Sequence, residues 1–249
     1  MDDRKLFKNE CALEIALQGK DKELISATGH WIKLANIKKY SYHFSWFGRP
    51  IIQYPQDIVA MQEIIWEVKP DLIIETGIAR GGSLIFSASM LILLEISGLI
   101  QGGQVVGIDV DIRKHNRTEI EKHLFSNKIK MIQGSSTDKV IVKQVYDFAR
   151  TYKNILVVLD SNHTYEHVLA ELNNYAPLVS KGSYCVVFDT IIEDLPEGMF
   201  PDRPWGKGNN PKTAVWEYLK SHPEFEIDKA IQQKLLITVA PDGYLKRVA

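Results

Sequence analysis

The chain has 249 residues, a formal net charge of −1 at pH 7 and two cysteines. Its Lys and Arg residues are scattered along the sequence, which argues against an electrostatic nucleic-acid surface, so we expect no nucleic-acid partner. Cys11 and Cys185 lie far apart and match no zinc-ligand spacing. The sequence therefore indicates neither a disulfide framework nor a cysteine metal site.

Export and membrane signals are not evident either. The N-terminal MDDRKLFKNE lacks the basic start and apolar core of a signal peptide. The longest apolar run, residues 84–96, is too short to cross a bilayer. We therefore expect a cytoplasmic protein with no membrane span.

Residues 1–69 come first and predict one or two helices, followed by an aromatic stretch, YSYHFSWFGRPIIQYP, that is too irregular for a helix. We expect this N-terminal helical and aromatic extension to pack over the open end of a sheet. No linker rich in Ser, Gly and Pro divides the remainder, so residues 70–249 are expected to form one large α/β domain.

Within residues 70–249, short apolar runs alternate with amphipathic segments. This rhythm predicts a doubly wound, mostly parallel seven-stranded sheet covered by helices on both faces. Strands are expected at 71–76, 104–110, 128–134, 154–160 and 183–189, and helices near 82–97, 113–125, 137–152, 164–179 and 211–221.

The C-terminal part predicts an antiparallel edge and a lid. Residues 225–230 and 234–240 read as two strands so close in sequence that they must pair as an antiparallel hairpin, because a parallel crossover needs a dozen or more residues. Residues 191–213 are rich in Pro and Gly and long for a connection in a compact domain. Such a loop is typical of a cover over a binding site.

Ligands of parallel sheets bind outside the carboxyl ends of the strands. The first strand ends in ETGIARGGS, where small residues let a ligand approach the backbone and the following helix start favours negative charge. The spacing is not GxGxxG, which argues against a nicotinamide-dependent oxidoreductase. Glu75 would oppose a pyrophosphate but suit an amino group, and Asp109 after the second strand is placed to bind a ribose diol. A tight turn with a capping acid is the alternative.

A second polar cluster, DSNHTYEHV, follows the fourth strand. Asp160 ends that strand and Asp189 ends the fifth, so both carboxylates are expected at neighbouring strand ends, and such a pair of oxygen ligands suits Mg²⁺. The alternative is structural. Asp160 would then begin a turn, while His163 and His167 would line a solvated helix face.

The motifs ExGxAxG, GID and GSSTD after successive strands resemble those of class I S-adenosylmethionine-dependent methyltransferases, which have a Rossmann-like fold. More narrowly, the chain resembles the cephalosporin-hydroxylase-like family, whose members are similar to macrolide-sugar and rhamnosyl O-methyltransferases. The likeness runs from about residue 40 to the C-terminus. The stretches that carry it are WFGRPIIQYPQD (46–57), ETGIARGGS, GIDVDIRKHNR (107–117), DSNHTYEHV and PWGKGNNPKTAV (204–215).

This resemblance implies an S-adenosylmethionine-dependent O-methyltransferase that acts on a hydroxyl of a small molecule, a sugar or glycan precursor. Asp160 and His163 match the family's DxxH pattern, in which the aspartate is catalytic and binds a metal and the histidine is the base. Asp189 matches the second acid of a metal-binding pair. The cofactor-binding residues would be Glu75, Gly77, Ala79, Gly81, Ser83, Asp109, Ser135 and Ser136.

The chain departs from the family pattern at Phe188, which stands where the first acid of the pair is expected. Bound Mg²⁺ would then be weaker, recruit Glu193 or Asp194, or be absent. Two other functions stay open. A cofactor-binding protein that has lost its metal site fits Phe188, whereas a non-haem iron hydroxylase needs two histidines and a carboxylate and finds only the spacing His222 to Glu224.

The apolar helix expected at 84–96 and the aromatic N-terminal region offer more hydrophobic surface than one sheet face requires. We therefore expect a homo-oligomer, most simply a dimer.

Overall fold

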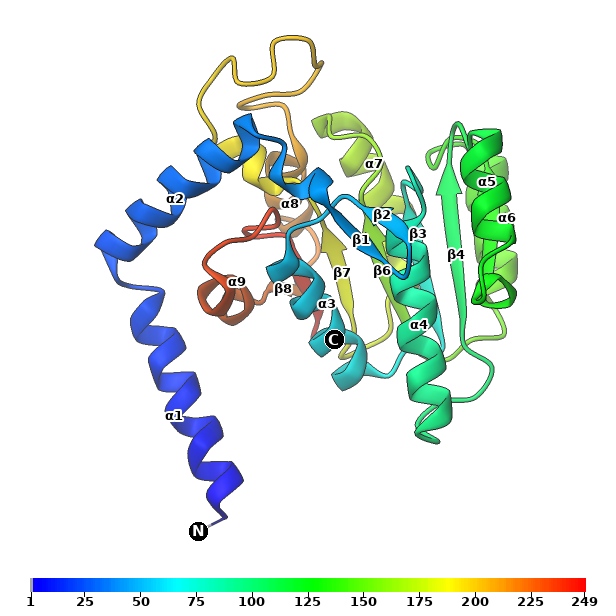
Figure 1. The fold of residues 1–249 in the computed structure, drawn as a ribbon, viewed down its shortest axis with the longest axis horizontal. Coiled ribbons are helices and arrows are strands. Elements are labelled where there is room, and N and C mark those ends of the chain that lie inside the picture. Colours follow the sequence, from blue (N-terminus) through cyan, green and yellow to red (C-terminus); the bar gives the residue numbers. More distant parts are fainter. Residues whose placement is uncertain (1) are drawn as a thin grey trace.

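The computed structural model describes residues 2–249 and contains a seven-stranded sheet with the order β5-β4-β3-β6-β7-β9-β8 (Figure 1). All neighbouring pairs from β5 to β7 are parallel, and β9 runs antiparallel to both β7 and β8. This confirms the predicted doubly wound, mostly parallel sheet with antiparallel C-terminal strands. The strands are β3 (Leu72–Thr76), β4 (Gln104–Asp109), β5 (Ile129–Gln133), β6 (Ile155–Leu159), β7 (Tyr184–Val187), β8 (Phe225–Ile227) and β9 (Tyr244–Arg247).

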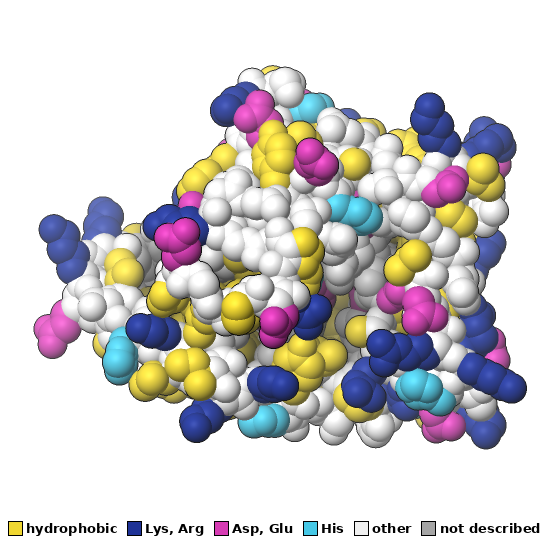
Figure 2. All heavy atoms as spheres, turned by 90° about the horizontal axis from the view of Figure 1, so that it is seen from above, with side chains coloured by type: hydrophobic (Ala, Val, Ile, Leu, Met, Phe, Trp, Pro, Cys, Tyr) yellow, Lys and Arg dark blue, Asp and Glu magenta, His cyan; other side chains and the backbone are white. Residues whose placement is uncertain are grey.

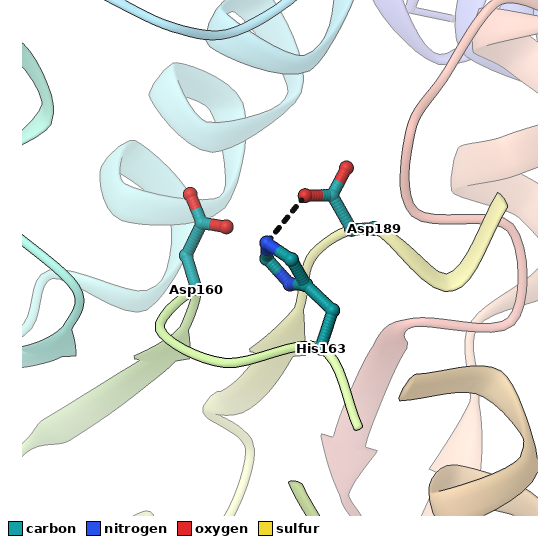
Figure 3. A group of neighbouring side chains, drawn as sticks. All are labelled: Asp160, His163 and Asp189. Carbon is teal, nitrogen blue, oxygen red and sulfur yellow. Dashed lines mark ion pairs between the residues drawn. The ribbon is translucent and has the colours of Figure 1, made fainter. Parts of the chain in front are cut away.

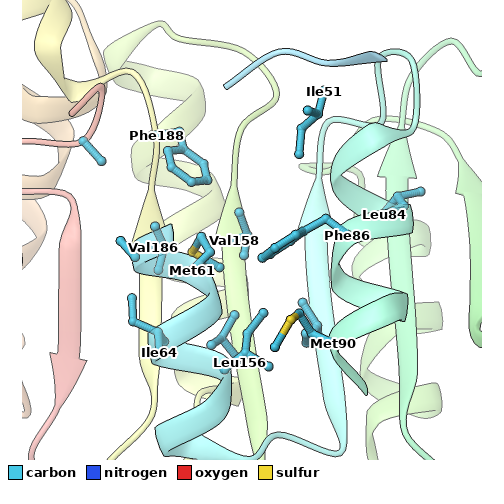
Figure 4. Packing of buried hydrophobic residues seen from close by; sticks show 14 of the residues in the cluster. Ile51, Met61, Ile64, Leu84, Phe86, Met90, Leu156, Val158, Val186 and Phe188 are labelled. Atoms are coloured by element: carbon cyan, nitrogen blue, oxygen red, sulfur yellow. The ribbon is translucent and has the colours of Figure 1, made fainter. Parts of the chain in front are cut away.

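Helices cover both faces of this sheet, and alternate residues of each strand face opposite sides. Ile73 of β3 joins the hydrophobic cluster beneath α3 and α4, which Figure 4 shows, whereas Leu72 and Ile74 join the cluster on the other face. The helices that flank the strands are α3 (Pro55–Val68), α4 (Gly82–Ile96), α5 (Lys114–Glu121), α6 (Lys139–Ala149), α7 (Tyr165–Tyr175) and α8 (Pro211–Leu219).

The N-terminal region begins with two helices, α1 (Asp3–Gln18) and α2 (Lys22–Ile37). Helix α1 has no buried residue and extends away from the sheet (Figure 1). The aromatic stretch then forms a 3₁₀ turn and the antiparallel pair β1 (Phe44–Trp46) and β2 (Arg49–Ile51). This hairpin lies on α4. Trp46 Nε1 donates to Ser89 Oγ at 3.1 Å, and a Cβ atom added to Gly82 would lie 2.2 Å from the Pro50 carbonyl oxygen.

The predicted strand at 234–240 is wrong. Helix α9 (Lys229–Leu235) and a coil occupy the connection between β8 and β9, and the last strand lies further on, at Tyr244–Arg247. The reason is the carboxylate of Asp57 on α3, which is fully buried. It accepts hydrogen bonds from Thr238 Oγ1, from Val239 N at 2.9 Å and from Tyr244 Oη at 2.7 Å. Asp57 thus supplies hydrogen-bond acceptors to the polar groups of this coil, which therefore needs no neighbouring strand to pair with.

Two general features follow from the surface. None of the helices in residues 2–249 combines the length and apolarity of a bilayer-spanning segment. Figure 2 views the molecule from the side at which the parallel strands end, and acidic side chains lie among the Lys and Arg side chains there. The strand ends on this side carry the polar residues that the sequence singled out.

Candidate active site

Asp160, His163 and Asp189 come together at the carboxyl ends of β6 and β7, as Figure 3 shows. Asp160 follows β6 directly, and its backbone N–H donates to the Thr76 carbonyl at 3.0 Å. Asp189 lies just after β7 with a left-handed backbone, φ 56°. One potential ligand atom from each of the three side chains lies within 4.8 Å of the other two, and His163 Nε2 is 3.2 Å from Asp189 Oδ2. The predicted cluster at neighbouring strand ends is therefore present.

The electrostatics of this group favour a cation. Burial raises the pKa of Asp160 well above its ordinary value, and the nearby carboxylates of Asp189 and Glu75 raise it further. Two carboxylates that approach each other disfavour joint ionisation, and a divalent cation between them removes that penalty. The two carboxylates supply the hard oxygen ligands that such an ion prefers, and the His163 imidazole lies beside them.

Phe188 does not contribute to this donor set. Its side chain is 2% exposed and belongs to the hydrophobic cluster with Val158 and Val186 (Figure 4). The position at which the family resemblance led us to expect an acid is therefore part of an apolar wall. A carboxylate there would be buried without a partner in the cluster, which is costly.

Neither of the two acids suggested as substitutes is recruited. Glu193 Oε2 accepts from Gly208 N at 2.7 Å and from Asn210 Nδ2 at 2.5 Å. Asp194 Oδ2 instead pairs with Lys212 Nζ at 2.6 Å. Both carboxylates have partners at the segment that leads into α8, so of the three alternatives left open by Phe188 this geometry does not favour their recruitment.

The cluster opens into a cavity of about 320 Å³. Residues from three distant parts of the chain line it: the N-terminal region, the strand ends and the segment before α8. Trp205 contacts His163 edge to face, with ring centroids 4.8 Å apart. The lining includes Asn36, Tyr42, Gln53, Asp160, His163, Asp189, Phe200, Arg203 and Trp205.

A smaller cavity of about 40 Å³ adjoins it at the glycine turn after β3. Residues 77–83 line this cavity, and it shares Ile52, Gln53 and Asp160 with the larger one. Gly77 is required here, because its φ is 91° and a Cβ atom would lie 1.9 Å from the Asp160 carbonyl oxygen. The turn that includes Gly77, Ala79, Gly81 and Ser83 is therefore packed directly against the loop that carries the acidic cluster.

The two acids predicted to contact a cofactor are both hydrogen-bonded by the turn. Ser83 Oγ donates to Glu75 Oε1, and burial raises the pKa of Glu75 to about 7. Asp109 Oδ2 accepts from Ile78 N at 2.8 Å and from Ala79 N at 3.2 Å. The capping role that the sequence left open for Asp109 is thus present. A carboxylate oxygen can accept more than one hydrogen bond, so each acid retains capacity for a ligand.

The serines after β5 lie in different surroundings. Ser135 Oγ lies 3.0 Å from Thr137 Oγ1. Ser136 is buried, and its Oγ lies 3.0 Å from His167 Nε2, which is also 3.2 Å from Ser161 Oγ. His167 therefore links the loop after β5 to the loop that carries Asp160.

Three residues that line the larger cavity do not lie at strand ends and were not predicted from the sequence as site residues. Gln53 is 6% exposed and follows β2 rather than a strand of the main sheet, although it lies in the stretch WFGRPIIQYPQD. Arg203 and Trp205 belong to the segment before α8. The signal for Gln53 and Trp205 was their presence in motifs of the resembled family, and none pointed to Arg203.

The iron hydroxylase is not favoured by this geometry. Its ligand set requires two histidines and one carboxylate, whereas the cluster contains one histidine and two carboxylates. His222 stacks on Tyr218, with ring centroids 3.7 Å apart, and does not join the cluster.

Solved structures with a similar fold are known. An apo structure of CmcI has a TM-score of 0.57 and 20% sequence identity, with 84% of this chain and 77% of that chain covered. A CmcI structure with Mg and SAM has a TM-score of 0.55, also at 20% identity, with 84% and 78% covered. These likenesses support the Rossmann-like methyltransferase fold.

Sequence relatives extend this result. A rhamnosyl O-methyltransferase from Mycobacterium leprae (strain TN) is 29% identical over 205 residues, which cover 82% of each chain. One from Mycobacterium bovis (strain BCG / Pasteur 1173P2) is 33% identical over 198 residues, which cover 77% of this chain and 73% of the relative. The family model described as Rhamnosyl O-methyltransferase/CmcI matches residues 38–248. The chain therefore belongs to the rhamnosyl O-methyltransferase/CmcI family and is an S-adenosylmethionine-dependent O-methyltransferase.

Proposed function

We propose that the protein transfers the methyl group of S-adenosylmethionine to a hydroxyl of a sugar or glycan precursor. The observation that carries this proposal is the junction of the two cavities, where the acidic cluster meets the glycine turn. A methyl donor at the turn and a hydroxyl beside the cluster would lie on either side of Asp160. The rhamnosyl O-methyltransferase relatives support a sugar as the acceptor.

In this proposal the turn binds the amino-acid end of the cofactor. Gly77, Ala79, Gly81 and Ser83 provide the close backbone approach, and Glu75 pairs with the amino group. A cationic amino group would favour the ionised form of Glu75, whose pKa burial has raised. Three further residues complete the proposed set: Asp109 for the ribose, with Ser135 and Ser136 at the end of the next strand.

The acidic cluster acts on the acceptor. Asp160 and Asp189 would hold a magnesium ion, which when bound orients the hydroxyl and lowers its pKa. His163 accepts the hydroxyl proton on Nε2, the ring nitrogen that faces Asp189. Trp205 limits the rotation of the imidazole by its edge-to-face contact. The chain's main contribution is alignment of the hydroxyl oxygen with the methyl group and the sulfur.

The test is methyl transfer from isotopically labelled S-adenosylmethionine to a panel of rhamnose-containing acceptors and of acceptors that lack a sugar. We expect label in a methylated sugar and release of S-adenosylhomocysteine. Transfer only to acceptors without a sugar, or binding of S-adenosylhomocysteine with no transfer to any sugar, would contradict the proposed acceptor class.

We also propose a homo-oligomer, although the apolar helix that suggested it offers little free surface. Most of α4 is buried in the core. Helix α1 contacts α9 but leaves Leu6, Phe7, Leu13 and Leu17 exposed. These apolar side chains lie on a helix that has no fully buried residue, so a second copy is the expected cover for them.

Light scattering at micromolar concentration should show a dimer or larger assembly. Leu13→Glu should shift it toward monomer, because it places a charge in the exposed apolar stripe. Lys8→Gln, which makes the same change in net charge at an exposed position of the same helix away from the stripe, should not. A monomer at every concentration would contradict the proposal.

A further inference from the structure

The larger cavity contains one Lys or Arg side chain, Arg203, among the residues that line it. Its acidic residues, Asp160 and Asp189, lie together in the cluster with His163. The negative charges of the cavity lie at the cluster and its positive charge lies at Arg203. An acceptor with charge at one end would therefore bind in one orientation. A ligand that fills the cavity must match both charged groups.

The exposed side chain of Arg203 lies against the ring of Trp205. Its Cζ lies 5.0 Å from the centroid of the Trp205 ring, a cation–π distance. Trp205 in turn contacts the His163 ring at 4.8 Å. These three side chains form a continuous series from the acidic cluster to Arg203. The guanidinium therefore lies no more than about 10 Å from the imidazole, which is within the reach of one ligand in a cavity of this size.

Arg203 has no carboxylate partner within residues 2–249, although Glu197 and Asp202 are close in sequence. Its N–H donors therefore stay available to a ligand. A planar guanidinium matches the oxygens of phosphate groups and forms charge-assisted hydrogen bonds with them. A neutral sugar would leave this capacity unused.

We propose that Arg203 binds a phosphate of the acceptor, so that the acceptor is a sugar with a phosphate or nucleoside diphosphate on its anomeric carbon. This inference rests on the proposed function. With the reacting hydroxyl beside His163, an anomeric phosphate lies one sugar ring away, toward Arg203. The carboxylates of the cluster repel the phosphate, and Arg203 attracts it, so only one orientation of the ring is favoured. Methylation would then precede the transfer of the sugar to its final carrier.

The experiment compares three probes: rhamnose 1-phosphate, a nucleoside-diphosphate rhamnose and methyl rhamnoside. We expect the wild type to prefer a phosphorylated probe. Arg203→Gln should lower kcat/KM for that probe by about 10- to 100-fold, the loss that follows from removing a charge-assisted hydrogen bond. Its effect on kcat/KM for methyl rhamnoside should be several-fold smaller, because loss of the Arg203–Trp205 contact affects both probes, whereas loss of the phosphate contact affects only the charged one. Preference for the nucleotide over the simple phosphate identifies the source of the anion.

Lys207→Gln provides a matched control, because Lys207 is an exposed cation of the same segment that does not line the cavity. It should change neither value. Equal losses with charged and neutral probes, or no loss with either, would overturn the role of Arg203.

Binding separates this inference from the proposed function. If no probe is methylated, calorimetry with rhamnose 1-phosphate in the presence of S-adenosylhomocysteine still decides. Weaker binding to Arg203→Gln than to Lys207→Gln supports the phosphate site even when the proposed function has failed. Equal binding to both variants overturns it.

Discussion

Replacement of Asp160 by alanine should abolish methyl transfer and leave the affinity for S-adenosylhomocysteine nearly unchanged. The carboxylate lies in the cluster with His163 and Asp189, where a cation would meet the acceptor oxygen rather than the cofactor. Lewis-acid stabilisation contributes several kcal/mol, so turnover should fall by on the order of 10³-fold or more. The measurements are single-turnover methyl transfer and calorimetric cofactor binding.

The second proposed ligand of this ion, Asp189, allows an independent test. Asp189→Ala should reproduce the loss, and the double variant should be little worse than either single one, because both residues would serve one ion. Chelation by EDTA should inactivate the wild type and be reversed by Mg²⁺. Glu166→Ala is the control, since Glu166 is an exposed acid close to the cluster in sequence. Full activity in EDTA, together with an active Asp160→Ala variant, would leave the cluster with a structural role only.

Replacement of His163 by alanine should lower kcat by about 10²- to 10⁴-fold, the range for loss of a positioned general base. Its Nε2 faces Asp189, and Trp205 packs against the ring. Added imidazole should restore part of the rate, because it supplies the missing base in the space that the side chain leaves.

This rescue separates a base from a merely structural histidine. His115→Ala, at an exposed position on α5, should keep the wild-type rate. An unchanged kcat for His163→Ala would assign proton removal to another group. A large loss without rescue, accompanied by a lower melting temperature, would indicate that His163 acts through the fold.

Much of the site could be predicted because parallel strands place their ends together. Asp160 and Asp189 are far apart in sequence, yet the pairing of β6 with β7 makes them neighbours. Apolar runs and their spacing were enough to find both strands. His163 follows Asp160 so closely that it shares the location.

The predicted strand at 234–240 was wrong and Arg203 was missed because contacts between distant parts of the chain determine both features. The apolar run 234–240 fits a strand by composition, but the buried carboxylate of Asp57 holds Thr238 and Val239 as a coil. Likewise Arg203 reaches the cavity from a segment outside any strand end, and no local pattern marks it. Hydrophobic periodicity and secondary-structure propensity are local properties of the sequence and do not identify contacts with distant residues.

The contact of the β1–β2 hairpin with the start of α4 has a consequence for folding. Gln53 follows this hairpin, and it shares both cavities with Asp160, which lies more than one hundred residues later in the chain. Such a contact costs chain-closure entropy before it stabilises anything. The two cavities therefore exist only after Gln53 and Asp160 have come together. A partly folded chain with an intact parallel sheet would have Asp160 and Asp189 at neighbouring strand ends. It would lack the part of the cavity lining that Gln53 provides.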